Sequence, residues 1–199
     1  MSSNISKSLN VLIGLTGSVA TIKANNLVSD LSSAFSKIGI SVNIQIVATE
    51  SALFFYNKIP NENNCILYTD KDEWSSWNEK GDPVLHIELR KWADCLIIAP
   101  LDANTLAKIA NGLCDNLLTC IIRAWDPKNP IFVCPAMNTY MYEHPLTSIH
   151  ISSLLSYFHV IEPISKSLAC GDVGVGAMAS TPDIARFVSS FFSQPPSSA

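Results

Sequence analysis

Two segments decide the fold: Cys95-Leu-Ile-Ile-Ala-Pro-Leu-Asp-Ala-Asn-Thr105 and Ile131-Phe-Val-Cys-Pro-Ala-Met-Asn138. In each of them an apolar run of strand length stops at a proline and gives way to small, hydrogen-bonding residues. Apolar runs of this kind, flanked by helical sequence, are typical of buried parallel strands. Ligands of open α/β sheets bind beyond the carboxyl ends of such strands. We therefore expect residues 102–105 and 136–138 to line one pocket.

The length of 199 residues suits one domain with its own core and is short for two. We expect a disordered N-terminus at residues 1–8, one domain at residues 9–192 and a flexible Ser/Pro tail at residues 193–199. The glycine-rich residues 170–180 lack a period. They predict a mobile loop within a flap of about residues 165–182.

The composition argues against several classes of partner. Hydrophobic residues make up 48% of the chain and charged residues 15%, which leaves apolar surface for a partner subunit to cover. The net charge of −4 and the absence of a Lys/Arg run argue against nucleic-acid and anionic-membrane binding. The apolar runs are far shorter than the roughly 20 residues of a membrane-spanning helix. Because residues 1–10 also lack the apolar core of a secretory signal, we expect a cytoplasmic protein with possible access to the nucleus.

The six cysteines form no CxxC pair, and most of them lie in apolar runs. This placement is typical of buried, reduced thiols rather than of disulfides. The four histidines show no metal-ligand spacing with the cysteines. We therefore expect no metal site.

A strand, a tight turn and a helix open the domain. Residues 9–15 are apolar, Gly17 and Ser18 interrupt the run, and residues 19–38 have helical character. A turn that opens a helix presents backbone N–H groups and the positive end of the helix dipole, which suits a phosphate. An ordinary N-cap explains the same residues. No GxGxxG or GxxxxGK[ST] motif follows, which argues against a dinucleotide site and a P-loop.

A second strand is expected at residues 41–48, followed by small polar residues and by Phe54 and Phe55. An aromatic ring beside a strand end either stacks on a flat cofactor or packs in the core. Residues 70–81 are expected to be irregular and at the surface. Further elements are expected as helices at residues 106–110, 115–123, 149–157 and 181–192 and as an edge strand at residues 160–161.

Two polar residues remain open to a structural and a functional interpretation. His86 lies between Leu85 and Ile87, where it is either a structural residue or a proton-transfer group. Asn138 either caps the short helix that follows it or presents its amide to a ligand.

Taken in order, a series of motifs resembles those of the flavin-dependent cysteine decarboxylase family. The motifs cover residues 9–184, and their order makes the resemblance specific. They are Gly17-Ser-Val-Ala20, Val84-Leu-His-Ile-Glu-Leu-Arg90, Pro100-Leu-Asp-Ala-Asn-Thr105, Gly112-Leu-Cys-Asp-Asn-Leu-Leu-Thr-Cys120, Arg123-Ala-Trp-Asp126, Pro135-Ala-Met-Asn-Thr-Tyr-Met141 and Leu168-Ala-Cys-Gly-Asp172.

The resemblance implies a Rossmann-like, flavodoxin-type three-layer α/β sandwich with a parallel sheet. It also implies FMN as the cofactor and a homotrimer with active sites between subunits. The activity that it implies is a carboxy-lyase reaction of coenzyme A biosynthesis, from 4'-phosphopantothenoylcysteine to 4'-phosphopantetheine. In this reaction the flavin oxidises the substrate thiol to a thioaldehyde, CO2 leaves, and the enethiol is reduced again.

The resemblance also implies roles for individual residues. It assigns catalysis to His86 and Cys170, and substrate binding to Asn138, Ala169 and Met141. The residues that it assigns to the cofactor are Gly17, Ser18, Val19, Ala20, Thr49, Ser51, Phe55, Asp102, Ala103, Asn104, Thr105 and Ala136.

The chain departs from the family pattern at two positions. Tyr142 stands where the family has tryptophan, and Asp102 stands where the familiar pattern has serine. Tyrosine keeps the aromatic face. A carboxylate aimed at the cofactor's phosphate would weaken binding, so we expect Asp102 to meet ribityl hydroxyls or backbone N–H groups instead.

Two alternatives within related families stay open. One is a non-catalytic flavin-binding regulatory subunit that inhibits a protein phosphatase. Such chains lack one of the three residues His86, Asn138 and Cys170, which are all present here. The other is a flavin prenyltransferase, which lacks the Pro-Ala-Met-Asn and Ala-Cys-Gly-Asp segments.

Overall fold

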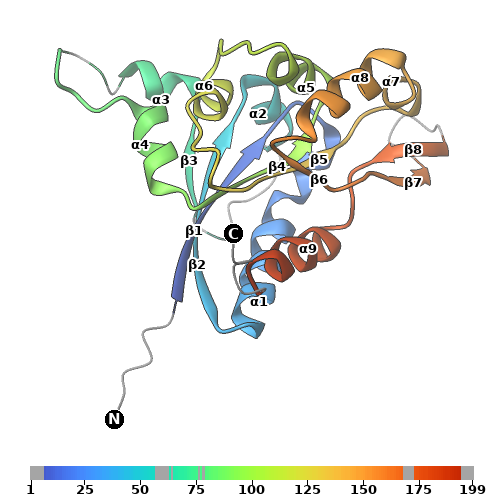
Figure 1. Cartoon of the computed structure of the whole chain (residues 1–199), viewed down its shortest axis with the longest axis horizontal. Helices are drawn as coiled ribbons and strands as arrows, with labels where there is room; N and C mark the ends of the chain where they lie inside the picture. The colour runs from blue at the N-terminus through green and yellow to red at the C-terminus, as the bar shows by residue number, and fades with distance from the viewer. Residues whose placement is uncertain are drawn as a thin grey trace.

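A six-stranded parallel sheet in the order β3-β2-β1-β4-β5-β6 forms the centre of the molecule (Figure 1). The computed structural model describes residues 7–56, 63, 65–75, 77, 79–167 and 173–193. This strand order is that of the Rossmann fold, so the predicted fold class is confirmed. The strands are β1 (Lys7–Leu15), β2 (Ile40–Ala48), β3 (Ile66–Tyr68), β4 (Cys95–Leu101), β5 (Ile131–Pro135) and β6 (His159–Val160).

Helices cover both faces of the sheet and make three layers. Because side chains of a strand alternate between its two faces, Val11 of β1 packs in one core cluster and Leu12 in the other. The first cluster includes side chains of α1 (Ala24–Lys37) and α9 (Thr181–Ser193). The second includes side chains of α4 (Leu85–Trp92), α5 (Ala103–Ala110), α6 (Leu117–Arg123) and α8 (Pro145–Leu154). The short helices are η1 (Val19–Lys23), α2 (Glu50–Tyr56), α3 (Asp70–Ser75) and α7 (Thr139–Tyr142).

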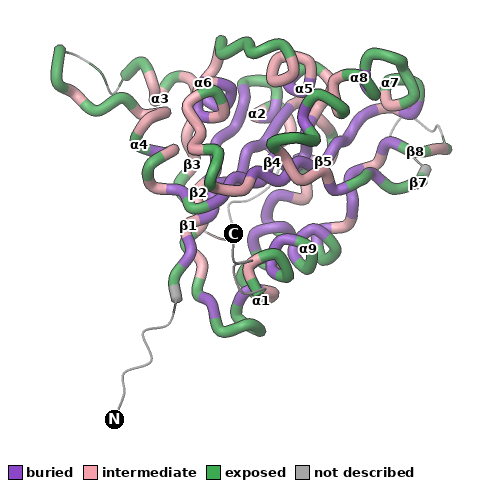
Figure 2. The backbone as a smooth tube through the Cα atoms, in the orientation of Figure 1, coloured by how far each residue is buried: buried purple, intermediate pink, exposed green. Residues whose placement is uncertain are grey.

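The two strands predicted from their apolar runs, β4 and β5, are present and buried along their whole length (Figure 2). Their carboxyl ends lie side by side, because Leu101 pairs with Pro135 and the Ala136 N–H donates to the Leu101 carbonyl over 2.9 Å. The segments that follow them therefore reach the same edge of the sheet.

The predicted helix at residues 19–38 is divided into the 3-10 helix η1 and the α-helix α1. The Thr21 hydroxyl donates to the Thr16 carbonyl over 2.8 Å, which holds the first turn tightly against the end of β1. The other helices and the edge strand β6 are present with shifted bounds. The largest shift is at α8, which begins at Pro145 because the His144 side chain caps it, accepting from the Leu146 N–H over 3.2 Å.

The prediction of irregular structure at residues 70–81 is wrong for residues 70–75, which form α3. Asp72 stabilises its start, since one carboxylate oxygen accepts hydrogen bonds from the Thr69 N–H and hydroxyl, both over 2.7 Å. The expected surface position is confirmed, because the Trp74 side chain is 80% exposed.

The prediction of a loop at residues 170–180 is wrong for residues 173–177. These residues form β8 (Val173–Ala177), which pairs antiparallel with β7 (Ile164–Ser167) in a separate two-stranded sheet. The hairpin stands beside α7 at the right of Figure 1. The predicted tails, residues 1–8 and 193–199, lie mostly outside the described residues.

Candidate active site

A cavity of about 450 Å³ opens at the carboxyl ends of β1, β4 and β5. It lies where the strand order reverses, which is the ligand-binding position of open α/β sheets. The pocket is lined by Gly17, Ser18, Val19, Ala20, Ile22, Lys23, Phe55, Asp102, Ala103, Ala136, Met137, Asn138, Met141, Lys166, Gly176, Ala177 and Met178. The two segments after β4 and β5 thus share one pocket as expected, although Asn104 and Thr105 do not line it.

A larger cavity of about 840 Å³ lies elsewhere, beside α6, α8 and β6. Residues of the motifs at 112–120 and 123–126 line part of it, but none of the residues assigned to catalysis, substrate or cofactor does. We therefore place the candidate site in the smaller cavity, where the polar strand-end residues converge.

Asp102 ties the first turn of the chain to the end of β4. Its Oδ2 accepts from the Gly17 N–H over 3.0 Å, and its Oδ1 accepts from the Thr105 N–H over 2.7 Å. The carboxylate therefore caps α5 and meets backbone N–H groups, as expected. A second hydrogen bond joins the same two segments, because the Asp102 N–H donates to the Thr16 hydroxyl over 2.8 Å.

Gly17 occupies a space that no side chain fits. A Cβ atom there would lie 2.6 Å from Ser51 Oγ and 3.0 Å from Asp102 Oδ2. The Ser51 hydroxyl is in turn 3.2 Å from the Thr49 hydroxyl. Neither Thr49 nor Ser51 lines the pocket. Their mutual contact and the packing of Ser51 against Gly17 place both hydroxyls beside the first turn.

Ser18 caps η1, with its hydroxyl accepting from the Ala20 N–H over 3.4 Å. The N-cap interpretation of this turn is confirmed, and the phosphate interpretation stays a prediction. Asn138 combines the two roles considered for it, since it lines the pocket while its Oδ1 caps α7, accepting from the Tyr140 N–H over 2.9 Å.

The hairpin β7–β8 packs directly on the start of α7. The Met137 N–H donates to the Gly176 carbonyl over 2.9 Å, and Gly176 has φ +143°. A Cβ atom at Gly176 would lie 2.4 Å from the Met137 carbonyl oxygen, and one at Gly174 would lie 2.6 Å from the Thr139 side chain. Glycine at both positions therefore lets the hairpin close one side of the pocket. Ala169 and Cys170, between the two strands, lie outside the described residues.

Tyr142, one of the departures from the family pattern, also links α7 to the base of this hairpin. Its hydroxyl donates to Glu162 Oε2 over 2.8 Å. Burial and the hydrogen bond to Glu162 raise the pKa of Tyr142 to about 12. The tyrosine therefore remains a neutral hydrogen-bond donor at physiological pH.

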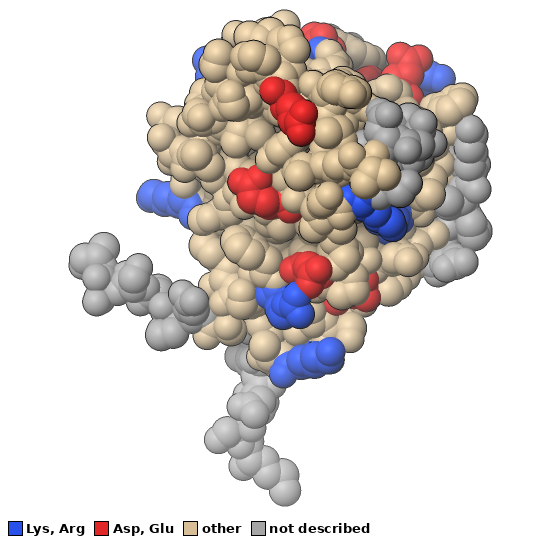
Figure 3. Space-filling view, turned by 90° about the vertical axis from the view of Figure 1, so that its right-hand side faces the viewer, with Lys and Arg blue, Asp and Glu red and all other residues tan. Residues whose placement is uncertain are grey.

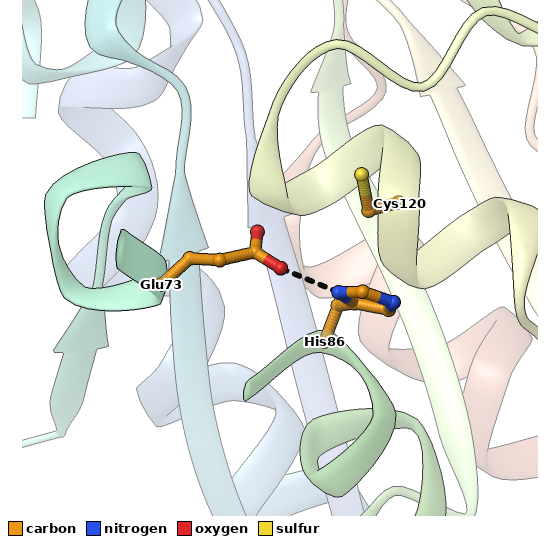
Figure 4. Close-up of side chains that lie close together, drawn as sticks. All are labelled: Glu73, His86 and Cys120. Atoms are coloured by element: carbon orange, nitrogen blue, oxygen red, sulfur yellow. Dashed lines mark hydrogen bonds and ion pairs between the residues drawn. The ribbon is translucent and has the colours of Figure 1, made fainter. Parts of the chain in front are cut away.

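His86 does not line this pocket. It lies on α4, where its Nδ1 contacts Glu73 Oε1 of α3, with Cys120 of α6 nearby (Figure 4). Within one chain, the structure thus brings Asn138 to the cavity and leaves His86 outside it.

Two lysines that the sequence motifs did not predict, Lys23 and Lys166, also line the pocket. Burial, and secondarily the charge of Lys166, lower the pKa of Lys23. Lys23 ends the short helix that Ser18 begins, so its place near the first turn could have been predicted from the sequence. Lys166 lies on β7, and only the folding of the hairpin brings it to the pocket. Two lysines at one pocket favour an anionic ligand.

The described cysteines are reduced, as predicted. Burial raises the pKa of both Cys95 and Cys134, so these thiols stay protonated. Cys114 is an exception to the predicted burial because it is exposed.

The molecular surface also bears on partners. No helix among the described residues has the length and apolar character needed to cross a membrane. Seen from the side of the hairpin, most of the surface is neither acidic nor basic (Figure 3). Large apolar side chains of α7 and α8 are exposed, among them Tyr140 at 76%, Leu146 at 53% and Ile149 at 60%.

Comparisons with known proteins agree with this geometry. A family model described as Flavoprotein matches residues 1–193. The phosphopantothenoylcysteine decarboxylase of Mus musculus is 50% identical over 185 residues, which cover 92% of this chain and 87% of the mouse protein. The protein of the same name from Oryza sativa is 54% identical over 170 residues, covering 85% and 74%.

Solved structures show the same likeness. A cysteine-to-serine mutant of a PPC decarboxylase, complexed with pantothenoylaminoethenethiol, is 52% identical with a TM-score of 0.85, covering 94% of this chain and 100% of the other. The FMN binding protein AtHal3 is 53% identical with a TM-score of 0.80, covering 94% and 98%. HAL3 from Cryptococcus neoformans is 35% identical with a TM-score of 0.75, covering 94% and 98%.

Proposed function

The chain belongs to the flavoprotein family, among the phosphopantothenoylcysteine decarboxylases, and from this premise we propose that it is an FMN-dependent enzyme. It decarboxylates 4'-phosphopantothenoylcysteine to 4'-phosphopantetheine, a step of coenzyme A biosynthesis. The observation that carries this proposal is the pocket at the end of β1, β4 and β5, which brings residues 17–20, Phe55, Asp102, Ala136 and Asn138 to one cavity. Relatives with this name, about half identical over most of the chain, support the substrate.

The residues of the pocket fit FMN. The first turn lines the cavity with Gly17, Ser18 and Ala20, whose small side chains leave room for a phosphorylated chain. The Asp102 carboxylate bonds backbone N–H groups, so it does not confront a phosphate alone. Lys23 and Lys166 add positive charge, and Phe55 adds an aromatic face beside the pocket.

The reaction explains why a cofactor is needed. Direct loss of CO2 from a cysteine carboxylate would leave an unstabilised carbanion, and protein side chains supply no electron sink. A bound flavin would create that sink by oxidising the substrate thiol to a thiocarbonyl, which accepts the electron pair released with CO2. The two electrons held by the flavin would then reduce the enethiol.

The chain's own residues bind the substrate and move protons. Asn138 holds the substrate carboxylate with a neutral amide, because a cation there would stabilise the ground-state anion and oppose its loss. His86 accepts the thiol proton, and Cys170 returns a proton in the final reductive step.

The position of His86 outside the pocket of its own chain supports an active site shared between subunits. We propose a homotrimer in which the neighbouring subunit brings His86 to the pocket that contains Asn138. The exposed apolar side chains of Tyr140, Leu146 and Ile149 support a subunit interface at α7 and α8. The hairpin side of the molecule carries only scattered charged residues (Figure 3).

Subunit mixing tests the shared site. His86→Asn and Asn138→Ala proteins are each expected to be inactive, and refolding them together should restore about a quarter of the wild-type activity, since each site then draws at random on two chains of a symmetric ring. The measurement is CO2 release after mixing. Mixed samples that stay inactive, with mixed oligomers confirmed by mass, would contradict the shared site.

Gly17→Ala tests the cofactor site. The added methyl group must displace Ser51 or the turn, at a cost of about 1–3 kcal/mol, and this corresponds to FMN binding that is about 5- to 160-fold weaker. The measurement is FMN titration of the apoprotein by flavin fluorescence. Gly39→Ala is the control for lost stability without a change at the pocket, because φ at Gly39 is +74°, which strains alanine, and Gly39 does not line the cavity. Equal FMN affinity in Gly17→Ala and wild-type protein would place the flavin elsewhere.

The likeness to HAL3 from Cryptococcus neoformans does not separate the regulatory-subunit alternative from the enzyme, because a HAL3 of Malus domestica carries the name phosphopantothenoylcysteine decarboxylase. The presence of His86, Asn138 and Cys170 in one chain favours the enzyme instead. The two functions separate in one assay, because a purely regulatory subunit binds FMN and leaves 4'-phosphopantothenoylcysteine unchanged.

A further inference from the structure

The imidazole of His86 is held from one side by a carboxylate. Its Nδ1 contacts Oε1 of Glu73, a residue 13 positions earlier in the chain (Figure 4). The two side chains are only 25% and 11% exposed, respectively. A carboxylate so far removed from water needs hydrogen-bond donors to compensate for its lost hydration, and the imidazole N–H is one of them.

The helix that carries Glu73 is anchored on two sides. At its start, Asp72 accepts from the Thr69 N–H and hydroxyl. Asp70 accepts from the Leu117 N–H over 2.8 Å, which ties α3 to the start of α6. Because these hydrogen bonds hold α3 in place, Glu73 can keep the imidazole of His86 in one orientation.

We propose that Glu73 is the positioning residue of the catalytic histidine. An ionised carboxylate only accepts hydrogen bonds, so Nδ1 of the neutral ring carries the proton and Nε2 presents its lone pair. In the proton-transfer step, the substrate S–H bond breaks, an Nε2–H bond forms and the thiolate keeps the electron pair. This inference rests on the proposed function, because it gives His86 the role of proton acceptor.

The same cluster offers a metal-binding alternative, since donor atoms of Glu73, His86 and Cys120 lie within 4.8 Å of one another. Two observations favour the positioning role. Nδ1 already bonds the carboxylate, and Cys120 Sγ donates to the Cys114 carbonyl over 3.3 Å. Burial, and secondarily the charge of Glu73, raise the pKa of Cys120 to about 11, so this thiol stays protonated beside His86.

The first test reads the ring directly. In the wild-type FMN-loaded protein with 15N-labelled histidine, the imidazole nitrogen shifts of His86 at pH 9 are expected to show the proton on Nδ1, with the His86→Asn spectrum assigning the signals. Glu73→Gln is expected to give a mixture of the two tautomers, because an amide both donates and accepts. A proton on Nε2 in the wild-type protein would overturn the proposal, and this reading needs no variant at position 73.

The second test is kinetic. Glu73→Gln is expected to lower kcat about 10- to 100-fold, which is part of the contribution of a proton-transfer residue, with KM and FMN content unchanged. Glu88→Gln is the matched control: it removes the same charge from the helix of His86, where Glu88 bonds Lys91 over 2.9 Å. A Glu73→Gln kcat equal to that of wild type, or activity that disappears when the wild-type protein is treated with a chelator, would overturn the assignment.

The two proposals fail in different ways. If the wild-type protein does not decarboxylate 4'-phosphopantothenoylcysteine, the proposed function fails, whatever the tautomer of His86. If the enzyme is active but His86 carries its proton on Nε2, only the role of Glu73 is wrong.

Discussion

Replacing His86 by asparagine is expected to lower kcat about 100- to 10,000-fold, the range that a positioned proton-transfer group contributes. Asparagine has no ring nitrogen that accepts a proton in the reaction. The purified variant is expected to remain yellow, because His86 does not line the pocket of its own chain. The measurement pairs steady-state CO2 release with the flavin content of the same sample.

His144→Asn is the matched control for this variant. His144 caps α8 through its ring nitrogen, and asparagine is itself a favourable N-cap residue, so fold and turnover should both persist. A colourless His86→Asn protein would indicate a structural role for His86. A yellow His86→Asn protein with wild-type turnover would remove it from the mechanism.

Replacing Cys170 by serine is expected to change the product rather than to stop the reaction. A serine hydroxyl is a far weaker acid than a thiol, so the final protonation fails while oxidation and CO2 loss proceed. The oxidised enethiol, which has one H2 less than 4'-phosphopantetheine, should accumulate. Mass spectrometry of the product, with CO2 measured in parallel, checks this.

Cys114→Ser serves as the control because Cys114 is an exposed thiol. Its product should be fully reduced 4'-phosphopantetheine. If the Cys170→Ser protein also gave the reduced product at the wild-type rate, the proton would have to come from another group.

The centre of the fold could be predicted from the sequence because burial there is nearly complete. The segments 96–99 and 131–134 show uninterrupted apolar character, as strands covered on both faces must. The small polar residues that follow these strands are expected to meet, since the carboxyl ends of parallel strands lie at one edge of the sheet. The pocket formed by Asp102, Ala136 and Asn138 was therefore predictable.

The hairpin β7–β8 was not predictable in this way. Val173-Gly-Val-Gly-Ala177 has the glycine content of a loop, and its strand conformation depends on pairing with β7 and on the backbone contact between Gly176 and Met137. These are tertiary contacts, and local propensity carries no information about them. Lys166 reaches the pocket for the same reason.

The contact between Glu73 and His86 could not be predicted from the sequence either. Glu73 lies in a segment with exposed tryptophans and no apolar period, where the helix α3 depends on the Asp72 cap. Its contact with His86 arises from the packing of two short helices.

Turnover of 4'-phosphopantothenoylcysteine by the purified protein, with flavin absorbance and CO2 recorded in the same sample, is the decisive measurement. We expect a yellow protein whose colour fades and returns while CO2 and 4'-phosphopantetheine form in equal amounts. A colourless protein that takes up no FMN, or a yellow one that leaves the substrate unchanged, would contradict the proposed function.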